Sequence, residues 1–356
     1  MSRMMIMAGG TGGHVIPALA VARELRDRGV DVSWIGTPQG LESRLVPNAG
    51  IDFDAIDIKG LRKSGLLRAL AMPFMLAKAM FQTLGLIRNR KPDAVLGMGG
   101  FVSGPGGLVA AMMRIPLVLH EQNSVAGLTN KWLARLTRHV FTGFPAAAGI
   151  SDFTWVGNPV RKEISDLPAP AQRLAGRTGP LRILVVGGSQ GASVFNQNLP
   201  ELLGNGGLVE LEVWHQCGRQ GDETIGLSYE EKSIAASVDT FIDDMAAAYE
   251  WCDFAICRAG AMTVSELCAA GVAALLVPYP HAVSDHQALN AAFMVEAGAA
   301  YMVRQEEFLT GNWVTEVSAL GTDRQRLITM SQHARDLSRP NAAEDVATAC
   351  QEVMDA

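Results

Sequence analysis

The sequence predicts an α/β protein of two domains, each built on a parallel sheet covered by helices. Three observations lead to this prediction: the length, the alternation of strand-sized apolar runs with helix-sized amphipathic ones, and a glycine-rich loop that follows the first strand of each half. At 356 residues the chain exceeds the usual size of one hydrophobic core. Hydrophobic residues make up 48% of it and charged residues 19%, as in a well-packed globular protein. Such alternation is typical of parallel sheets with helices on both faces.

The expected strands are 3–8, 30–37, 93–98, 117–122 and 139–144 in the first half, and 181–188, 211–217, 238–244, 254–260 and 273–280 in the second. Amphipathic segments separate them, such as 15–29, which has Pro17 near its start and Gly29 at its end. The proline- and glycine-rich stretch 157–180 marks the boundary between an N-terminal domain, 1–159, and a C-terminal domain, 160–339. The last helix, 340–356, is expected to return to the N-terminal domain, although packing on the other half stays open.

Charge and cysteine content exclude several classes of protein. The net charge of −6 and the isoelectric point near 5.7 argue against a nucleic-acid-binding protein, because phosphate backbones select a basic face. The five cysteines show no CxxC spacing, and no secretory signal is present. They are expected to be buried thiols in a reducing cytosol.

Three glycine-rich loops carry the predicted chemistry. They are MAGGTGGH at 7–14, GMGGFVSGPGG at 97–107 and VGGSQGAS at 186–193. Each follows a strand and opens a helix, where unpaired backbone N–H groups and the helix dipole favour an anion, typically a phosphate. Glycine lets the oxygens of the anion approach the amides closely.

Other phosphate and metal patterns do not fit. The dinucleotide fingerprint requires glycine where Val15 stands, and no loop ends in the GK[ST] of a Walker sequence. Hydride transfer and ATP hydrolysis are therefore minor alternatives. The pair Asp52 and Asp54 has the spacing of a metal-binding motif, but with Asp57 it is better explained as the polar face of a strand. No metal and no cofactor are expected.

Two helix starts in the second half allow two interpretations. Thr263 and Glu266 have the spacing of a capping box, and so do Ser284 and Gln287. Alternatively, a carboxylate and an amide at neighbouring helix starts bind the paired hydroxyls of a ribose and of a sugar, since a vicinal diol matches the two acceptor oxygens of a carboxylate.

Seven segments in order, GGTGGH, GMGGFVSGPGG, HEQNSVAGLTN, GNPVR, GGSQGA, FIDDMAAAY and CRAGAMTVSE, resemble the MurG family of glycosyltransferases over nearly the whole chain. The resemblance implies a GT-B fold, in which two Rossmann-like domains face each other across a cleft that holds the active site. It also implies inverting transfer of N-acetylglucosamine from UDP-N-acetylglucosamine to undecaprenyl-diphosphate-linked N-acetylmuramyl pentapeptide. This step converts lipid I to lipid II in peptidoglycan synthesis, and it needs no tightly held metal.

The same resemblance implies roles for individual residues on both substrates. The donor would be bound by Thr11, Gly12, Gly13, Asn123, Arg161, Ser189, Gln190, Gly191, Ile242, Ala261, Met262, Thr263, Glu266, His286, Gln287 and Asn290. Among them, Ser189 would contact the phosphates, Ile242 the uracil and Glu266 the ribose. The acceptor diphosphate would lie at Gly9, Gly10, Gly99, Gly100, Ser103, Gly104 and Gly106. Two positions depart from the family pattern. At His286 a member of the family has glutamine, which leaves the role of this residue in doubt, and at Phe101 tyrosine is common.

Transfer requires a general base for the attacking hydroxyl. His14 is the first candidate, because an imidazole titrates near neutral pH, at about 6.5, and the first loop aims it at the site. Glu121, in HEQN, is the second candidate. A loop-stabilising or phosphate-binding role for His14, and a surface or loop role for Glu121, stay open.

A basic and apolar segment predicts contact with a membrane. Residues 58–92 hold eight Lys or Arg and no acidic residue, and proline and lysine interrupt their apolar run. The predicted patch consists of Lys59, Arg62, Lys63, Leu66, Leu67, Arg68, Leu70, Phe74, Met75, Leu76 and Lys78. A peripheral protein on the cytoplasmic face of the inner membrane is expected, with cell-wall synthesis proteins as further partners. An ordinary core helix is the alternative.

Two other functions remain alternatives to the predicted transfer. One is a different GT-B enzyme that uses a UDP-sugar, such as a glycolipid glucosyltransferase or an epimerase. The other is a UDP-sugar-binding protein without catalytic activity.

Overall fold

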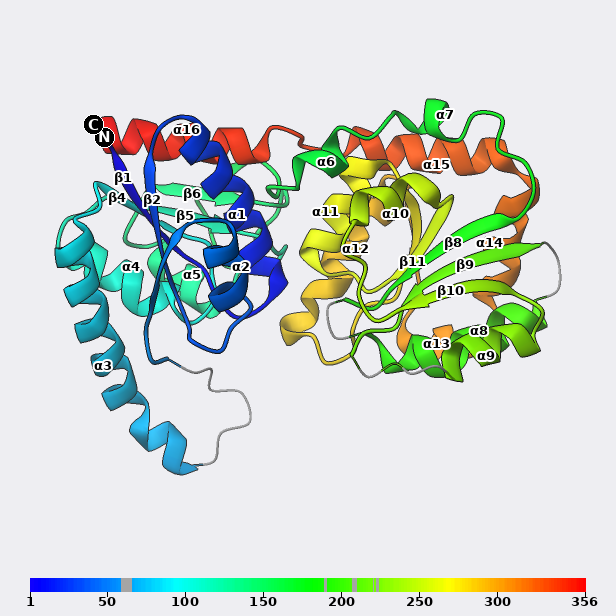
Figure 1. Cartoon of the computed structure of the whole chain (residues 1–356), viewed down its shortest axis with the longest axis horizontal. Helices are drawn as coiled ribbons and strands as arrows, with labels where there is room; N and C mark the ends of the chain where they lie inside the picture. The colour runs from blue at the N-terminus through cyan, green and yellow to red at the C-terminus, as the bar shows by residue number, and fades with distance from the viewer. Residues whose placement is uncertain (59–65, 189–190, 207–209, 220, 222–223) are drawn as a thin grey trace. The chain divides into compact units, whose positions relative to one another are not determined.

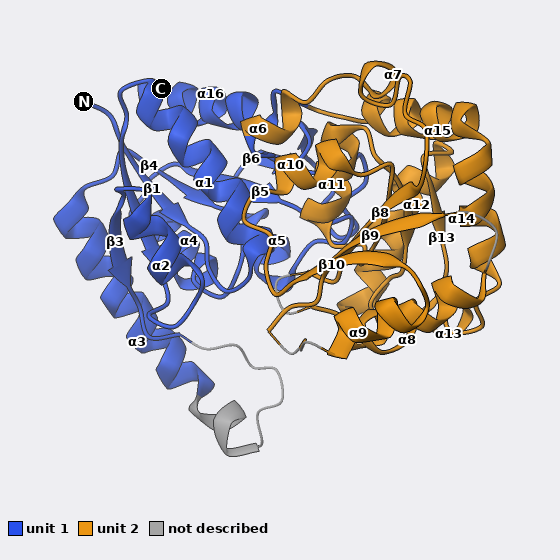
Figure 2. Cartoon of the chain, turned by 45° about the vertical axis from the view of Figure 1, so that its right-hand side comes forward, with its two compact units in different colours: residues 1–161, 340–356 blue, residues 162–339 orange. Residues whose placement is uncertain are grey.

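A computed structural model describes the chain except residues 59–65, 189–190, 207–209, 220 and 222–223 (Figure 1). It divides into two compact units. Unit 1 comprises Met1–Arg161 and Pro340–Ala356, and unit 2 comprises Lys162–Arg339 (Figure 2). Both ends of the chain therefore belong to unit 1, and unit 2 is a continuous segment between them.

Unit 1 contains a parallel sheet in the order β3-β2-β1-β4-β5-β6-β7. Its strands are β1 (Arg3–Met7), β2 (Asp31–Gly36), β3 (Asp52–Ala55), β4 (Ala94–Gly97), β5 (Leu117–Glu121), β6 (His139–Thr142) and β7 (Thr154–Trp155). Its helices are α1 (Gly12–Asp27), α2 (Glu42–Asn48), α3 (Leu66–Arg90), α4 (Ser103–Met112), α5 (Leu128–Leu133) and α16 (Ala342–Asp355). The chain order reverses between β1 and β4, where such sheets bind ligands at their carboxyl edge.

The sheet of unit 1 separates two hydrophobic cores, as the alternation of buried side chains along β1 requires. Met4 and Ile6 face a core shared with α1 and α16, whereas Met5 and Met7 face one shared with α3 and α4. The last helix contributes Val346 to the first core and packs along α1. The chain thus returns to the first unit to complete its core (Figure 2).

Unit 2 contains a parallel sheet in the order β10-β9-β8-β11-β12-β13. Its strands are β8 (Leu181–Val186), β9 (Leu211–Gln216), β10 (Ala235–Asp239), β11 (Phe254–Cys257), β12 (Ala273–Leu276) and β13 (Ala300–Met302). Its helices are α6 (Lys162–Ser165), α7 (Pro170–Arg173), α8 (Ser193–Asn205), α9 (Thr224–Glu231), α10 (Met245–Trp251), α11 (Ala261–Ala270), α12 (His286–Glu296), α13 (Gln305–Phe308), α14 (Trp313–Thr322) and α15 (Arg324–Asp336). Here the order reverses between β8 and β11.

One predicted strand is wrong. The segment 238–244 was expected to form a strand, but β10 is Ala235–Asp239, and Ile242 lies in the loop that follows it. β10 is an edge strand, and most of its side chains are exposed. An edge strand is paired on one side only, and its side chains can stay polar and exposed. The prediction therefore followed the apolar residues within 238–242 instead of the strand that begins at Ala235.

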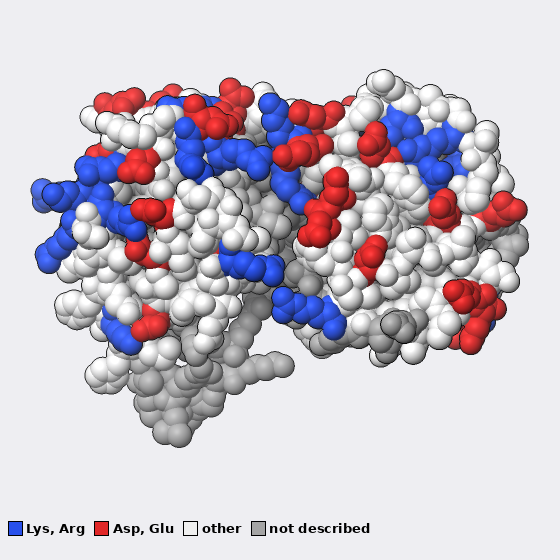
Figure 3. All heavy atoms as spheres, viewed as in Figure 1, with Lys and Arg blue, Asp and Glu red and all other residues white. Residues whose placement is uncertain are grey.

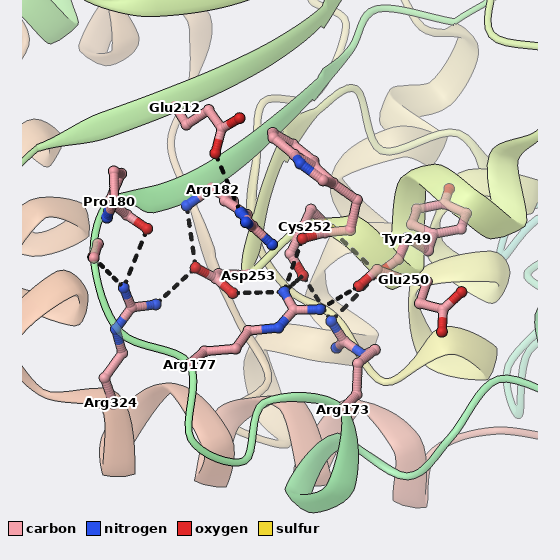
Figure 4. A network of polar contacts seen from close by, with 12 residues as sticks. Arg173, Arg177, Pro180, Arg182, Glu212, Tyr249, Glu250, Cys252, Asp253 and Arg324 are labelled. Carbon is pink, nitrogen blue, oxygen red and sulfur yellow. Dashed lines mark hydrogen bonds and ion pairs between the residues drawn. The ribbon is translucent and has the colours of Figure 1, made fainter.

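Asp253 is the centre of a polar network in unit 2 (Figure 4). Its carboxylate is 1% exposed and lies 2.8 Å from Arg177 Nη1 and 2.7 Å from Arg324 Nη1. It also accepts the backbone N–H of Arg182 at 3.1 Å. The network joins the segment before β8, the start of β11 and the start of α15.

We expect Asp253→Asn to lower the free energy of unfolding by about 3 kcal/mol, because removing one partner of a buried ion pair leaves the remaining charges unpaired. Urea denaturation followed by tryptophan fluorescence measures this loss. Glu212→Gln is the matched control, since Arg182 and Glu212 form a pair that is 41% and 40% exposed, and exposed pairs contribute below about 1 kcal/mol. Equal losses in the two variants would contradict the prediction.

The surface charges and the cysteines of the structure can be compared with the expectations from the sequence. On the face shown in Figure 3, basic and acidic side chains are interspersed on both units. Asp52 and Asp54 of β3 both pair with Arg90, which explains them as the polar side of a strand, and this pairing raises the pKa of Arg90. The five cysteines are free and buried, as expected.

Candidate functional site

The predicted site residues of unit 1 follow the carboxyl ends of three neighbouring strands. The first glycine loop follows β1, the second follows β4, and the HEQN segment follows β5. Because these strands are parallel and adjacent, the three loops meet at one edge of the sheet. The structure thus brings together residues far apart in the sequence.

His14 lies in the first turn of α1 and is half-buried. Its Nδ1 is 2.8 Å from Oε1 of Gln122, which directly follows β5. Gly99 lies beside the same nitrogen, because a Cβ added to it would lie 2.7 Å from His14 Nδ1. Thr11, Gly12 and Gly13 precede it at the helix start, where Thr11 is exposed.

Glu42, at the start of α2, holds the first glycine loop through hydrogen bonds, and the sequence analysis did not identify it. Its fully buried carboxylate accepts the backbone N–H of Gly10 at 3.0 Å, and the N–H and hydroxyl of Thr37 at 2.9 and 2.7 Å. A Cβ on Gly9 would lie 2.6 Å from this carboxylate. The N–H of Gly10 therefore donates to a carboxylate of the protein itself, and the missing side chain of Gly9 makes room for Glu42.

The second loop packs against the first. An added Cβ on Gly100 would lie 2.3 Å from the carbonyl oxygen of Gly9, and one on Gly106 would lie 2.1 Å from the sulfur of Met7. The buried hydroxyl of Ser103 accepts the N–H of Gly99 and lies 2.8 Å from the carbonyl oxygens of Met7 and Gly99.

Packing or loop-fixing contacts account for several of the residues predicted at the acceptor diphosphate. They are Gly9, Gly10, Gly99, Gly100, Ser103 and Gly106. Gly104 is half-buried, and a Cβ there would meet only an ordinary contact with Thr129. Contact of these residues with a diphosphate stays a prediction.

Glu121 is buried at the end of β5, and its carboxylate is surrounded by donors. It accepts the backbone N–H groups of Asn123 and Gly127, both at 3.0 Å, and the side-chain amide of Asn130 at 2.9 Å. The side chain of Asn123 also donates to it, at 3.3 Å. These bonds fix the loop between β5 and α5, and they favour His14 over Glu121 as the base.

A pocket of about 590 Å³ lies beside the first loop of unit 1. Gly10 and Phe101 line it from the two glycine loops, and Met75 and Lys78 line it from α3. Lys78 Nζ pairs with Asp57 at 2.8 Å. The pocket connects the glycine loops with the helix that carries the predicted membrane patch.

In unit 2 the predicted donor residues also follow the carboxyl ends of parallel strands. The loop after β8 contains Ser189 and Gln190, which lie outside the described residues, and ends at Gly191. Gly191 has a φ of +75°, and its added Cβ would lie 2.0 Å from the carbonyl oxygen of Cys217. Only glycine fits this turn between β8 and α8. Arg161 is the last residue of the first segment of unit 1, and Ile242 is buried in the loop before α10.

The capping interpretation of Glu266 is wrong. Helix α11 begins at Ala261 after Gly260, so Thr263 is inside the helix and caps nothing. The carboxylate of Glu266 is 7% exposed and accepts the hydroxyl of Tyr249 at 3.2 Å. Ala261 and Met262 are buried in the first turn. The alternative, a carboxylate that binds a ligand, stays a prediction.

The second capping interpretation is wrong as well. Helix α12 begins at His286, and Ser284 has a φ of +52° in the loop before it. Gln287 Oε1 accepts the backbone N–H of Tyr279 at 2.8 Å, which ties the helix start to the loop after β12.

Two further residues that were predicted to bind the donor substrate form hydrogen bonds with backbone carbonyls of unit 2. The fully buried Asn290 donates to the carbonyl of Ala259 at 3.2 Å, which joins α12 to the turn after β11. His286 Nδ1 lies 2.8 Å from the carbonyl oxygen of Val283.

Comparisons with known proteins agree with this architecture. The glycosyltransferase family 28 N-terminal domain matches residues 4–142, and the glycosyltransferase family 28 C-terminal domain matches residues 182–346. The chain belongs to glycosyltransferase family 28 and, within it, to the MurG group.

Individual relatives support this placement. The chain is 51% identical to the UDP-N-acetylglucosamine–N-acetylmuramyl-(pentapeptide) pyrophosphoryl-undecaprenol N-acetylglucosamine transferase of Marinobacter nauticus, over 98% of this chain and 97% of that protein. The crystal structure of Acinetobacter baumannii MurG has a TM-score of 0.85 and 41% identity, with 99% of this chain and all of the other covered. The UDP-N-acetylglucosamine 2-epimerase of Neisseria meningitidis, at 12% identity and a TM-score of 0.65 over 99% of this chain and all of that one, shares the GT-B fold alone.

Proposed function

We propose that the chain transfers N-acetylglucosamine, with inversion, from UDP-N-acetylglucosamine to the muramyl sugar of undecaprenyl-diphosphate-linked N-acetylmuramyl pentapeptide. This reaction converts lipid I to lipid II. The observation that carries the proposal is the 51% identity, over nearly the full length of both chains, to the Marinobacter nauticus enzyme that bears this activity in its name. The geometry of the two units supports it.

In the proposed reaction the sugar hydroxyl of the acceptor attacks C1 of N-acetylglucosamine, and the bond from C1 to the UDP oxygen breaks. The hydroxyl proton passes to His14, which stands at the loop edge of unit 1. The leaving UDP gains negative charge, which the loop after β8 and the N-terminus of α8 stabilise. Glu266 binds the ribose hydroxyls, and Ile242 contacts the uracil.

The pocket of unit 1 suits an acceptor with a lipid tail. Of its lining residues, Gly10 and Phe101 belong to the glycine loops and Met75 belongs to α3. A diphosphate near the start of α1 and Gly104 would have its lipid directed along this pocket towards α3. Lys78 and Asp57, which form an ion pair, both line the pocket, so the pair adds no net charge there.

A transfer assay with radiolabelled UDP-N-acetylglucosamine and a short-chain analogue of the lipid acceptor tests the proposal. We expect labelled disaccharide lipid and one UDP for each sugar transferred. Epimerised sugar without acceptor would indicate an epimerase, and donor binding without release of UDP would indicate a binding protein. Either result would replace the proposed function.

We further propose that unit 1 binds the cytoplasmic face of the inner membrane as a peripheral protein. No helix among the described residues combines the length and the hydropathy needed to cross a bilayer. On α3 the exposed fractions are 80% for Phe74, 39% for Leu76 and 74% for Phe81, so these side chains are not packed in the core. Ala79 and Ile87 of the same helix are buried and join it to the core of unit 1.

The other predicted patch residues differ in what the structure describes. Met75 is half-buried and Lys78 is exposed. Lys59, Arg62 and Lys63 lie outside the described residues, and for Leu66, Leu67, Arg68 and Leu70 only the helical backbone of α3 is described.

Two neighbouring helices also expose large apolar side chains. Helix α3 packs on α4, and α4 packs on α5. Met112 on α4 and Trp132 on α5 are 69% and 60% exposed. Three exposed arginines, Arg114, Arg135 and Arg138, line a second pocket of about 490 Å³ beside the amino ends of β5 and β6. These apolar and basic side chains also suit a surface of anionic lipids. Binding to other cell-wall synthesis proteins stays a prediction.

We expect the double change Phe74→Ser and Phe81→Ser to weaken binding to vesicles of anionic phospholipid at least about tenfold, because each phenyl ring that enters the bilayer contributes about 1.5–3 kcal/mol. Co-sedimentation with vesicles measures the affinity. Leu227→Ser, which removes a 56% exposed apolar side chain from α9 of unit 2, is the control and should bind as the wild type does. Unchanged binding of the double variant would remove α3 from the membrane contact.

A further inference from the structure

Behind His14, a line of polar contacts runs into the interior of unit 1. His14 Nδ1 lies 2.8 Å from Gln122 Oε1, Gln122 Nε2 lies 3.1 Å from His120 Nδ1, and His120 Nε2 lies 2.9 Å from the carbonyl oxygen of Gly157. His120 is fully buried and Gln122 is 1% exposed. Neither side chain takes part in the proposed reaction directly.

The inner end of the line fixes the protonation of His120. A backbone carbonyl can only accept, so the Nε2 that faces Gly157 must carry a proton. Burial lowers the pKa of His120 to about 4, which keeps the ring neutral near pH 7. The neutral ring then has a lone pair on Nδ1, and it accepts a hydrogen bond from Gln122.

Two hydrogen-bond acceptors determine which end of the Gln122 side-chain amide faces His120. Its Nε2 lies 3.1 Å from His120 Nδ1 and also 3.1 Å from the carbonyl oxygen of His120. Only the amide nitrogen can donate to both. The amide oxygen therefore faces His14, and His14 must donate from Nδ1. In the neutral ring of His14 the lone pair is left on Nε2.

The inner end is also held in place. The N–H of Gly157 donates to the carbonyl of Thr142 at 3.1 Å, with a φ of +90° that favours glycine. The side chain of Asn158 donates to the backbone carbonyl of Gln122 at 3.0 Å. These bonds hold the backbone at Gly157 and Gln122 in place. The carbonyl oxygen of Gly157 determines the donor and the acceptor in each hydrogen bond between it and His14.

We propose that Gln122 and His120 are positioning residues that hold His14 in the Nδ1–H tautomer, so that Nε2 always receives the proton of the attacking hydroxyl. The inference rests on the proposed function, in which His14 is the base. A free neutral imidazole samples both tautomers, and one of them would present no lone pair at Nε2. When Nε2 takes the proton, the bond from Nδ1–H to the amide oxygen becomes charge-assisted.

The partner of His14 is neutral, which distinguishes this arrangement from a carboxylate–histidine pair. On the elements nearest His14, the buried titratable side chains that the structure describes are Glu42, His120 and Glu121. The other charged groups are Arg44, which is exposed on α2, Arg3 at the amino end of β1, and those at the far end of α1 and on α16. Glu42 is bound to Gly10 and Thr37, and Glu121 is bound to Asn123, Gly127 and Asn130. A charge placed at position 122 would therefore be new to this environment.

The first experiment places that charge. In Gln122→Glu the carboxylate favours the protonated ring of His14, so the neutral base exists only at higher pH. We expect the acid limb of the kcat profile to move to higher pH by about one unit or more. Gln122→Leu removes the amide and should lower kcat about tenfold or more at every pH, with KM for UDP-N-acetylglucosamine unchanged. Gln216→Leu, the same change at a buried glutamine that ends β9, should keep the wild-type acid limb.

The second experiment needs only the wild-type chain and one assignment variant. In full-length protein with ¹⁵N-labelled histidine, two-bond ¹⁵N–¹H spectra report the tautomer of each ring, and His14→Asn identifies the His14 signals. We expect a protonated Nδ1 and a bare Nε2 at pH 8. In Gln122→Leu the same signals should indicate a mixture of tautomers.

The outcomes separate this inference from the proposed function. If the wild type transfers no sugar to the lipid acceptor, the proposed function fails whatever the tautomer. If the wild type is active but its His14 carries the proton on Nε2, the inference is wrong. It is also wrong if the acid limb of Gln122→Glu coincides with that of the wild type.

Discussion

His14→Ala should lower the rate of sugar transfer by about 10²–10⁴-fold at neutral pH, and its affinity for UDP-N-acetylglucosamine should stay unchanged. General-base catalysis contributes about this much when the base lies within hydrogen-bonding distance of the proton. The side chain belongs to unit 1, whereas the proposed contacts with uracil and ribose belong to unit 2. Turnover with the lipid acceptor and calorimetric titration with the donor measure the two quantities separately.

His139→Ala is the matched control for this variant. His139 begins β6 in the same unit and is exposed, so its loss should leave turnover at the wild-type level. If His14→Ala turns over normally, another group takes the proton. Equal losses of turnover and of donor affinity would indicate that His14 shapes the donor site instead.

Glu266→Gln should raise the dissociation constant of UDP about 10- to 100-fold. Hydrogen bonds to a charged group contribute about 1.5–3 kcal/mol, and about 1.4 kcal/mol corresponds to a factor of ten. The substitution keeps the volume of the buried side chain and removes its charge, so the packing of α11 is preserved. Isothermal titration with UDP gives the affinity directly.

Tyr249→Phe serves as the control for Glu266. It removes the hydroxyl that donates to the carboxylate at 3.2 Å but leaves the carboxylate in place. Its affinity for UDP should fall much less than that of Glu266→Gln, because the charged carboxylate that would bind the ribose is retained. Wild-type affinity in Glu266→Gln would assign the carboxylate to structure alone.

The sequence predicted the sheets well where strands are central, and less well at their edges. The runs that became β1, β4, β8 and β11 are apolar because both faces of a central parallel strand are buried. The edge strand β10 consists of Ala235–Asp239 and has mostly exposed side chains, so hydrophobicity could not locate it.

The glycine loops were recognised by their composition. Composition alone does not show which neighbouring group occupies the volume that a side chain at each glycine would fill. At Gly9 the neighbour is the Glu42 carboxylate, and at Gly106 it is the Met7 side chain. Sequence reasoning assigned both glycines to a ligand because Glu42 and Met7 come from other elements, and only the folded topology brings them close.

The polar line behind His14 was missed for a similar reason. Gln122 follows β5 and His14 opens α1, more than a hundred positions apart, and no spacing rule joins them. The only available signal was the cluster of polar residues in HEQN at the end of an otherwise apolar strand. It drew attention to Glu121, which the structure uses within the loop.

The return of α16 to unit 1 has a consequence for how the polypeptide is made. During synthesis residues 162–339 leave the ribosome as one continuous stretch and can reach their native packing first. The earlier segment must wait, because Val346, Ala347 and Cys350 belong to its interior and are translated afterwards. We therefore expect unit 2 to reach its native packing before unit 1 is complete, although most of unit 1 is translated first.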